Sequence, residues 1–242
     1  MSVTAEDIRS AATALQGHII RTPMLAAPML SREFGCDLFV KLECQQYTSS
    51  FKARGAYIAM QSLNAAQRKA GVIAMSAGNH AQAVAYHAES MGIPAVIVMP
   101  AQTPFAKVAR TRAYGAEVVL EGRNLNECEG TVNTLIDERG MTLIHPYDNV
   151  SVMTGQGTVG LEMLEDEPDL DMLVVPIGGG GLIGGIATIA REMRPNIKII
   201  GVQTKAYPTM QLAIAGKEIE CGGETLAEGI AVKKPGNVTR PV

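Results

Sequence analysis

Aromatic residues are scarce in this sequence. It contains no tryptophan, and its 242 residues include only four phenylalanines and six tyrosines. So few rings argue against a surface on which nucleic-acid bases could stack. The 21 basic and 24 acidic residues are interspersed and give a formal net charge of -3, so the basic stripe that nucleic acid requires is also missing. We therefore expect no nucleic-acid partner.

Cysteines and long apolar runs are also few. The four cysteines, at positions 36, 44, 128 and 221, fit neither a CxxC zinc pattern nor a dense disulfide framework. We interpret them as reduced thiols of a cytoplasmic protein. The first sixteen residues are polar and amphipathic, unlike a secretory signal, and no apolar run approaches the ~20 residues of a membrane helix. These absences predict a soluble protein with no membrane partner.

Short apolar runs alternate with longer helical patterns along most of the chain. Hydrophobic residues make up 47% of the sequence and charged residues 19%, which is ample apolar material for a core. The strands that we expect cover residues 38–42, 72–75, 95–99, 117–120, 172–177 and 197–202. Strands joined by helical crossovers predict an α/β fold, in which mostly parallel sheets are covered by helices on both faces.

Four consecutive glycines, Gly178 to Gly181, follow the expected strand at 172–177 and precede a helix that runs to Met193. Residues without a Cβ let backbone N–H groups crowd around a phosphate, and the helix start adds its positive end. The alternative is a tight turn in which glycine merely permits a positive φ. Such turns seldom need four glycines, so we favour a phosphate site.

Glycines 179, 181 and 184 also match the GxGxxG pattern of dinucleotide-binding folds. Such a fold places an acidic residue about 20 positions later, where it binds the ribose hydroxyl. The corresponding position lies near Gln203, and Thr204 and Lys205 follow it. Because that carboxylate is missing, a nucleotide-dependent dehydrogenase is the weakest of the functions that we consider.

Lys52 is the lysine whose surroundings suggest chemistry. We expect Ser50 to cap a helix that runs to about residue 62, which places Lys52 in the first helical turn. Most lysines are solvated surface charges. Here the positive helix end and the like charge of Arg54 both favour a lowered amine pKa, and so a better nucleophile. Phe51 is either core filler or a ring that packs against a flat cofactor.

A loop of small and polar residues follows the expected strand at 72–75. It comprises Ser76, Ala77, Gly78, Asn79 and His80. Exposed amides at a helix start suit a substrate carboxylate, and the Asn79 amide suits a phenolic oxygen. The alternative is a helix cap that binds no ligand. His80 and His87 have no third candidate ligand in the pattern, so we expect no metal site.

Five strings in this order resemble the fold-type II pyridoxal-phosphate enzymes. The strings are SFKARGA, SAGNHAQAVA, the expected helix start GQGTVGLE, PIGGGGLIGGIA and LAEGIAVKKPGN. Within that family they resemble the threonine dehydratase (threonine ammonia-lyase) and serine racemase branch, and most closely the biodegradative type of threonine dehydratase. The resemblance implies pyridoxal 5′-phosphate as cofactor. It also implies a tryptophan synthase β-like fold of two lobes, a large phosphate-binding lobe of residues 1–45 and 148–242 and a small substrate-carboxylate lobe of residues 46–147.

The resemblance also implies a role for each matching residue. Lys52 would hold the cofactor as a Schiff base and move the proton at the substrate Cα. The remaining implied positions are Gly178, Gly179, Gly180, Gly181 and the Leu182 amide for the phosphate, Asn79 for the ring hydroxyl, Phe51 beside the ring, and Ser76 to His80 for the amino-acid carboxylate.

The activity implied is β-elimination from L-threonine or L-serine, which yields 2-oxobutanoate or pyruvate and ammonia. Racemases of this branch carry a serine two positions before the asparagine as a second acid/base, whereas this chain has Ala77 there. Chemistry on one face of the substrate fits elimination better than racemisation. Serine racemase-like activity and a catalytically incomplete cofactor-binding subunit stay as alternatives, and a homo-oligomer (dimer or tetramer) is the implied assembly.

The sequence departs from the family pattern in three places. It ends at Val242, so we expect the C-terminal part of the family fold to be missing. Ser49 stands where glycine is usual, and Glu228 stands where aspartate is common. The preference for threonine or serine, and a role in isoleucine biosynthesis or in threonine catabolism, are left open by the sequence.

Overall fold

The structure is a computed structural model that describes residues 2–240, apart from the side chain of Asn126. Its helices are α1 Ala5–Ala14, α2 Pro28–Phe34, α3 Lys52–Gln61, α4 Ala65–Ala70, α5 Asn79–Met91, α6 Phe105–Arg112, α7 Leu125–Arg139, α8 Val150–Asp166, α9 Gly181–Met193 and α10 Thr209–Ile214, with the 3₁₀ turns η1 Glu43–Gln45 and η2 Glu228–Ile230. Its strands are β1 Met24–Ala26, β2 Phe39–Lys41, β3 Val72–Met75, β4 Ala95–Met99, β5 Glu117–Leu120, β6 Thr142–Leu143, β7 Met172–Pro176 and β8 Lys198–Val202.

The predicted α/β fold is confirmed. Four strands form a parallel sheet in the order β5-β4-β3-β6. Side chains alternate across this sheet, so that Val72 and Ile97 pack on the side of α5 and α6, whereas Ile73 and Val96 pack on the side of α7. Strands buried on both faces explain why these runs are apolar throughout.

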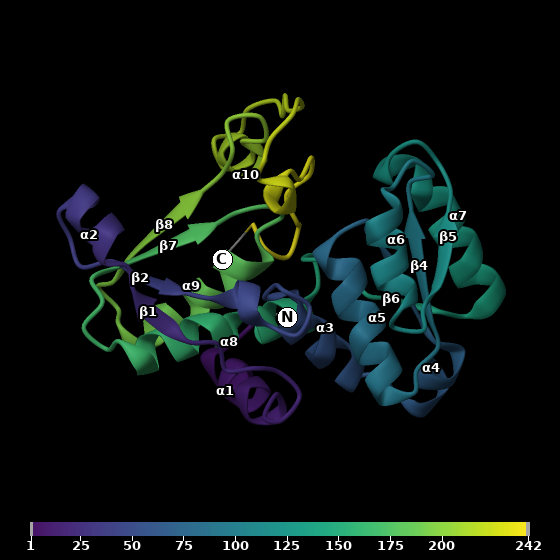
Figure 1. Cartoon of the computed structure of the whole chain (residues 1–242), viewed down its shortest axis with the longest axis horizontal. Helices are drawn as coiled ribbons and strands as arrows, with labels where there is room; N and C mark the ends of the chain where they lie inside the picture. The colour runs from purple at the N-terminus through teal and green to yellow at the C-terminus, as the bar shows by residue number, and fades with distance from the viewer. Residues whose placement is uncertain (1, 241–242) are drawn as a thin grey trace.

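The remaining strands form two smaller sheets. β1 pairs antiparallel with β2, and β7 pairs parallel with β8. On β7, Leu173 and Val175 are buried against α8 and α9, whereas Met172 and Val174 are 41% and 59% exposed on the outer face. Figure 1 shows the four-stranded sheet with its helices on one side of the molecule, the two smaller sheets on the other, and α3 between them. The lobe boundary at residues 46–147 stays a prediction.

Helix α3 crosses α8 with the two backbones in direct contact. A Cβ on Gly155 would lie 2.6 Å from the Gly55 Cα and 2.7 Å from the Arg54 carbonyl oxygen. The Gln156 side chain accepts a hydrogen bond from the Gly55 N–H at 3.3 Å. Both crossing positions therefore require glycine, and the contact fixes the distance between α3 and α8.

Two expected helix starts differ in the structure. The N-cap of α3 is Phe51, whose backbone is itself right-handed helical (φ -56°, ψ -14°), and no side chain caps this end. Ser50 therefore does not cap the helix, although Lys52 lies in its first turn as expected. The GQGTVGLE string begins at Gly155, inside α8 and not at its start, because the Asn149 side chain caps that helix by accepting from the Val152 N–H at 3.0 Å.

Smaller sequence features are explained as well. The expected capping box of Thr4 and Asp7 is present at the start of α1. Ser49 has φ 56°, and among residues 2–240 no other residue except glycine has a positive φ. This conformation favours glycine, which accounts for the usual residue at that position. Within the same described range, no helix is both long enough and apolar enough to cross a membrane.

The α3–α8 contact makes a prediction about stability. Gly155→Ala should lower the free energy of unfolding by about 2 kcal/mol, because the new methyl group meets backbone that cannot move aside. The matched control is Gly130→Ala in α7, where a Cβ meets nothing within 4 Å. That change should be neutral or stabilise the protein by up to about 1 kcal/mol. Urea unfolding of both variants measures the difference, and equal effects would contradict the packing argument.

Candidate active site

Lys52 is the first residue of α3, and its amine is buried. The Nζ donates a hydrogen bond to the carbonyl oxygen of Pro146 at 2.5 Å and lies 5.3 Å from the centre of the Phe51 ring. The aliphatic part of the side chain keeps some exposure, but burial of the amine lowers the pKa of Lys52 to about 8. About one tenth of this amine is therefore unprotonated at pH 7, far more than of an ordinary lysine, and the unprotonated form is the one that acts as a nucleophile or a base.

The expected contribution of Arg54 to this pKa is wrong. The shift in the pKa of Lys52 has burial as its cause. Arg54 is fully buried and directs its guanidinium to the carboxylates of Glu43 and Glu162. Because its charge is neutralised there, Arg54 does not act on Lys52 as an unpaired like charge.

Two histidines near Lys52 are held in the neutral form. His80 donates from Nε2 to the Ile144 carbonyl oxygen at 2.7 Å, and its Nδ1 is buried without a partner among the described residues. Burial, together with the charge of Lys52, lowers the pKa of His80 to about 3. Burial also lowers the pKa of His145. Lys52 is consequently the group in this cluster that changes its charge near neutral pH.

The segment from His145 to Asp148 joins Lys52 to the glycine run. Pro146 accepts from Lys52, and the next residue, Tyr147, packs its ring so tightly on Gly179 that a Cβ there would overlap it. The Tyr147 hydroxyl donates to the Lys234 carbonyl oxygen at 2.9 Å. The sequence interpretation missed this segment. The sequence offered one signal there, a proline and an aromatic residue between two expected elements. Because a backbone carbonyl accepts a hydrogen bond whatever its side chain, the residue type does not reveal this contact.

Gly178 to Gly181 connect β7 to α9, as predicted. Gly180 is the N-cap of α9 and has φ 99°, which only glycine adopts readily. The carbonyl oxygen of Gly179 points away from the helix axis and accepts from Thr239 Oγ1 at 2.6 Å and from the Gly236 N–H at 3.0 Å.

The amides of this turn are available for a ligand. Within residues 2–240, the backbone N–H groups of 178–183, which include Leu182, have no hydrogen-bond acceptor. Free amides at the start of a 13-residue helix form a site for an anion. The residues present therefore fit a phosphate group, although its binding to these amides stays a prediction.

The loop from Ser76 to His80 also begins a helix. The Ser76 hydroxyl accepts from the Gly78 N–H at 3.2 Å, and α5 begins at Asn79. The backbone N–H groups of Ala77, Asn79 and His80 have no acceptor in the described chain, which suits a carboxylate. Asn79 is exposed, and no hydrogen bond within residues 2–240 joins it to Lys52 or to the glycine turn. Its contact with the cofactor ring stays a prediction.

Phe51 has a place in the core as well as beside Lys52. It is partly buried against the apolar cluster formed by β7, α8 and α9. Phe51 is therefore part of the apolar core, which is one of the two roles expected from the sequence. The contact of Phe51 with a cofactor ring stays a prediction. Among the described residues, no three His, Cys, Asp or Glu side chains are placed to hold a metal ion.

Comparison with known proteins decides the family. The family model described as pyridoxal-phosphate dependent enzyme matches residues 15–242. The chain belongs to this family. Pyridoxal phosphate is the cofactor of the family, and the anion-binding turn and the buried amine of this pyridoxal-phosphate enzyme suit its phosphate and its aldehyde.

Named relatives of this pyridoxal-phosphate enzyme are similar along nearly the whole chain. An L-threonine ammonia-lyase of Thermotoga maritima is 44% identical over 239 residues, which are 98% of this chain and 60% of the relative. An L-threonine ammonia-lyase of Geobacter sulfurreducens is 46% identical over 237 residues, which are 97% of this chain and 59% of the relative. The chain thus spans about three fifths of the length of these two relatives.

Solved structures share the fold. The structure of maize serine racemase has a TM-score of 0.95 and 36% sequence identity, and the match covers 100% of this chain and 74% of the racemase. The fold of this pyridoxal-phosphate enzyme is therefore the fold-type II architecture that the sequence resemblance implied.

The lowered pKa of Lys52 can be measured directly. When the cofactor-free protein is mixed with pyridoxal phosphate and borohydride, the initial rate of labelling at Lys52 should be half-maximal near pH 8, because the unprotonated amine is the form that reacts. Other lysines should label with midpoints near pH 10.4, the ordinary value. Peptide mass spectrometry resolves the two classes, and a midpoint above pH 10 at Lys52 would contradict the burial of its amine.

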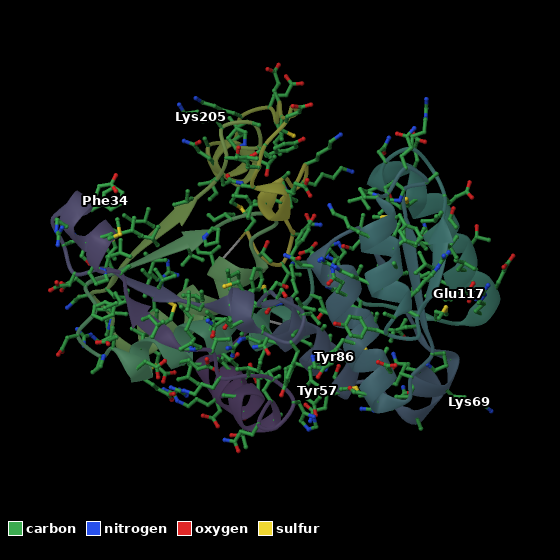
Figure 2. The ribbon with its side chains drawn as sticks, viewed as in Figure 1. Phe34, Tyr57, Lys69, Tyr86, Glu117 and Lys205 are labelled. Atoms are coloured by element: carbon green, nitrogen blue, oxygen red, sulfur yellow. The ribbon has the colours of Figure 1, made fainter. Side chains whose placement is uncertain are left out.

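Buried histidines make a second prediction, on stability in acid. His87 lies between the rings of Tyr57 and Tyr86, with centroid distances of 5.2 Å and 4.9 Å, at the contact of α3 with α5 (Figure 2). Burial lowers the pKa of His87 to about 4. Between pH 6.5 and 4 the unfolded chain therefore binds a proton that the folded chain excludes. His87→Phe should remove a loss of up to about 1.4 kcal/mol per pH unit in this window.

Urea unfolding of wild type and His87→Phe at pH 7 and pH 4.5 isolates this contribution. At pH 7 the two proteins differ by packing and by the hydrogen bond of His87 with the Ala53 backbone, and at pH 4.5 the variant should gain relative to wild type. A constant difference between the two pH values would show that His87 titrates normally in the folded state.

Proposed function

We propose that the whole protein is a pyridoxal-phosphate-dependent threonine/serine dehydratase (ammonia-lyase). It would convert L-threonine to 2-oxobutanoate, or L-serine to pyruvate, with release of ammonia. The observation that carries the proposal is the buried Lys52 amine, whose pKa of about 8 makes it the single group of the site that exchanges a proton near neutral pH. The names of the two ammonia-lyase relatives support the same reaction class.

Each element of the site would have one task. The Lys52 amine would hold the cofactor aldehyde and, as the free amine, would take the Cα proton of the substrate. Free amides at residues 178–183 hold the phosphate, and those at Ala77, Asn79 and His80 hold the substrate carboxylate. When bound, pyridoxal phosphate supplies an electron sink for the negative charge that develops at Cα.

Proton transfer at one face of the substrate distinguishes elimination from racemisation. Lys52 is a base on one face, and Ala77 has no proton to donate from the other. His80 and His145, which lie near Lys52, have lowered pKa values. Few of these imidazoles carry an extra proton at neutral pH, so they are poor proton donors there. The β-hydroxyl would then leave with a proton that Lys52 returns to it.

Serine racemase-like activity is the second candidate, because maize serine racemase shares the fold closely. Ala77 argues against racemisation, because its methyl side chain has no proton to donate to the substrate. A third possibility is that the chain binds the cofactor without completing the reaction. We further propose the two-lobe division at residues 46–147 and a homo-oligomeric assembly, which both follow from resemblance to the family, and a cytoplasmic location, which the four unpaired cysteines favour.

Product analysis separates these functions. With the cofactor bound, the protein should release ammonia and a 2-oxo acid from L-threonine or L-serine, and Lys52→Ala should lower kcat by about 10²–10⁴-fold, the usual contribution of a general base. Ala77→Ser tests the one-face argument, since it introduces the missing hydroxyl. D-serine as the main product of the wild type would indicate a racemase, and a bound cofactor without any product would indicate a binding protein.

A further inference from the structure

The guanidinium of Arg54 is completely enclosed and completely paired. Its Nε donates to Glu43 Oε2 at 2.9 Å. Its Nη1 donates to Glu162 Oε1 at 2.7 Å and to Thr158 Oγ1 at 3.1 Å. Its Nη2 donates to Glu43 Oε1 at 2.8 Å and to Glu162 Oε2 at 2.9 Å. All five N–H groups of the fork are therefore used, and only arginine can supply them in this geometry.

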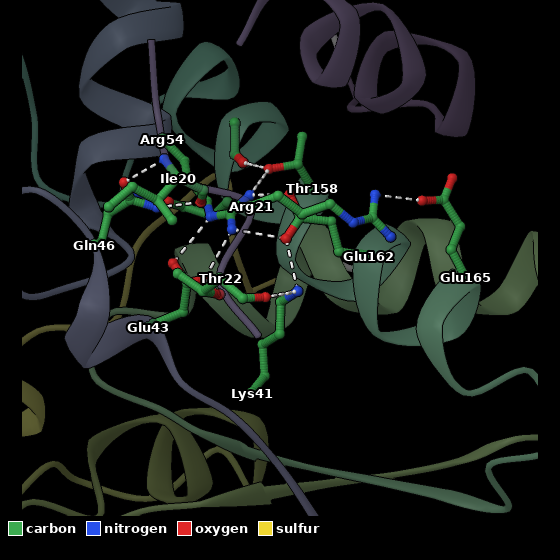
Figure 3. A network of polar contacts seen from close by, with 12 residues as sticks. Ile20, Arg21, Thr22, Lys41, Glu43, Gln46, Arg54, Thr158, Glu162 and Glu165 are labelled. Carbon is green, nitrogen blue, oxygen red and sulfur yellow. Dashed lines mark hydrogen bonds and ion pairs between the residues drawn. The ribbon is translucent and has the colours of Figure 1, made fainter. Parts of the chain in front are cut away.

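A second buried cation extends the network. Lys41 has a side chain that is 3% exposed, and its Nζ contacts Glu162 Oε2 at 2.8 Å, the Thr22 carbonyl oxygen at 2.7 Å and Asp166 Oδ2 at 3.2 Å. Figure 3 shows the two cations on either side of Glu162. Arg54 and Lys41 together balance the charges of Glu43 and Glu162, so the centre of the network is neutral.

Stability alone does not explain a network of this kind. Removing charges from water is costly, and apolar residues that fill the same volume often give an equal or more stable protein. Burial opposes the charge on Arg54, and its hydrogen bonds to Glu43 and Glu162 hold its pKa above its ordinary value. An ionic network instead fixes orientation, because a guanidinium that binds carboxylates in a bidentate way fits one arrangement of its partners.

The orientation of Arg54 affects Lys52, because Lys52 lies two residues before it in the first turn of α3. Successive residues of an α-helix are rotated by about 100°, so Lys52 and Arg54 point to nearly opposite sides of the first turn of α3. Arg54 holds one side to α8 through Glu162 and to η1 through Glu43. The other side then presents Lys52 to the Pro146 carbonyl. The next residue, Gly55, fixes the distance between α3 and α8.

We infer that Arg54 is a positioning residue, whose paired guanidinium sets the rotation of the first turn of α3 and so places the Lys52 amine against Pro146. The inference rests on the proposed function only in taking Lys52 as the lysine that binds the cofactor. The network holds the turn from the side opposite Lys52, so it orders the amine before any cofactor is bound.

The test uses Arg54→Lys in the full-length protein freed of cofactor. Lysine keeps the charge but offers three donors where five are needed, so the turn should loosen and the amine should gain contact with water. The pH midpoint for borohydride trapping of pyridoxal phosphate at Lys52 should rise by at least about one unit from about 8, toward the ordinary value. Labelling at pH 8 should be at least about fivefold slower as a result.

Arg21→Lys is the matched control. Arg21 belongs to the exposed edge of the same network, where it contacts Glu165 at 2.8 Å and Asp166 at 2.6 Å, and its side chain is 51% exposed. The same substitution there should leave the midpoint at Lys52 unchanged.

Thr158→Val is a milder second variant that removes one acceptor from Arg54 and keeps the side-chain volume. It should slow labelling at pH 8 about threefold, by analogy with loss of one modest hydrogen bond.

The outcomes are distinct. A raised midpoint in Arg54→Lys but not in Arg21→Lys supports the inference. If Arg54→Lys does not fold, slower labelling in Thr158→Val supports it and an unchanged rate overturns it. Loss of thermal stability with a midpoint still at that of the wild type assigns Arg54 a purely structural role and overturns it. No labelling of Lys52 in the wild type overturns both this inference and the proposed function.

Discussion

The buried ion pair between Arg54 and Glu162 is the interaction on which the geometry of the site depends. It joins the helix that carries the reactive lysine to the longest helix of the molecule, and Glu43 adds a third segment to the same guanidinium. Helix α8 packs in turn on α9, which begins in the glycine turn. The amine and the turn that would hold the two ends of one cofactor are therefore tied to a single rigid element.

Two kinds of constraint act together at this junction. The glycine contact between α3 and α8 limits how far apart the helices can lie, but a bare backbone contact leaves rotation about the helix axis free. The ionic network removes that freedom, since the fork of Arg54 matches two carboxylates in one orientation only. At the glycine turn, the ring of Tyr147 packs so closely on Gly179 that no Cβ would fit there.

The sequence predicted much of this site because its main features follow from residue type. The parallel strands at 72–75 and 95–99, the turn at Gly178 to Gly181 and the position of Lys52 in a first helical turn were all expected. The link through Pro146 and Tyr147 was not, because a backbone carbonyl can accept from lysine whatever side chain it carries. Arg54 was misread for a related reason. Its charge is visible in the sequence, whereas the carboxylates that neutralise it come from other elements: Glu43 lies in η1, before α3, and Glu162 lies 108 residues further along the chain.

The same separation governs the order in which the molecule can assemble. Arg54 is made long before Glu162, about a hundred residues later in the chain. A growing polypeptide that has reached only α5 therefore has nowhere to bury that guanidinium, and its α3 has no α8 to pack on. The first turn of α3, which carries Lys52, gains its ionic partner on α8 and the helix on which it packs only after the second half of the chain has been synthesised.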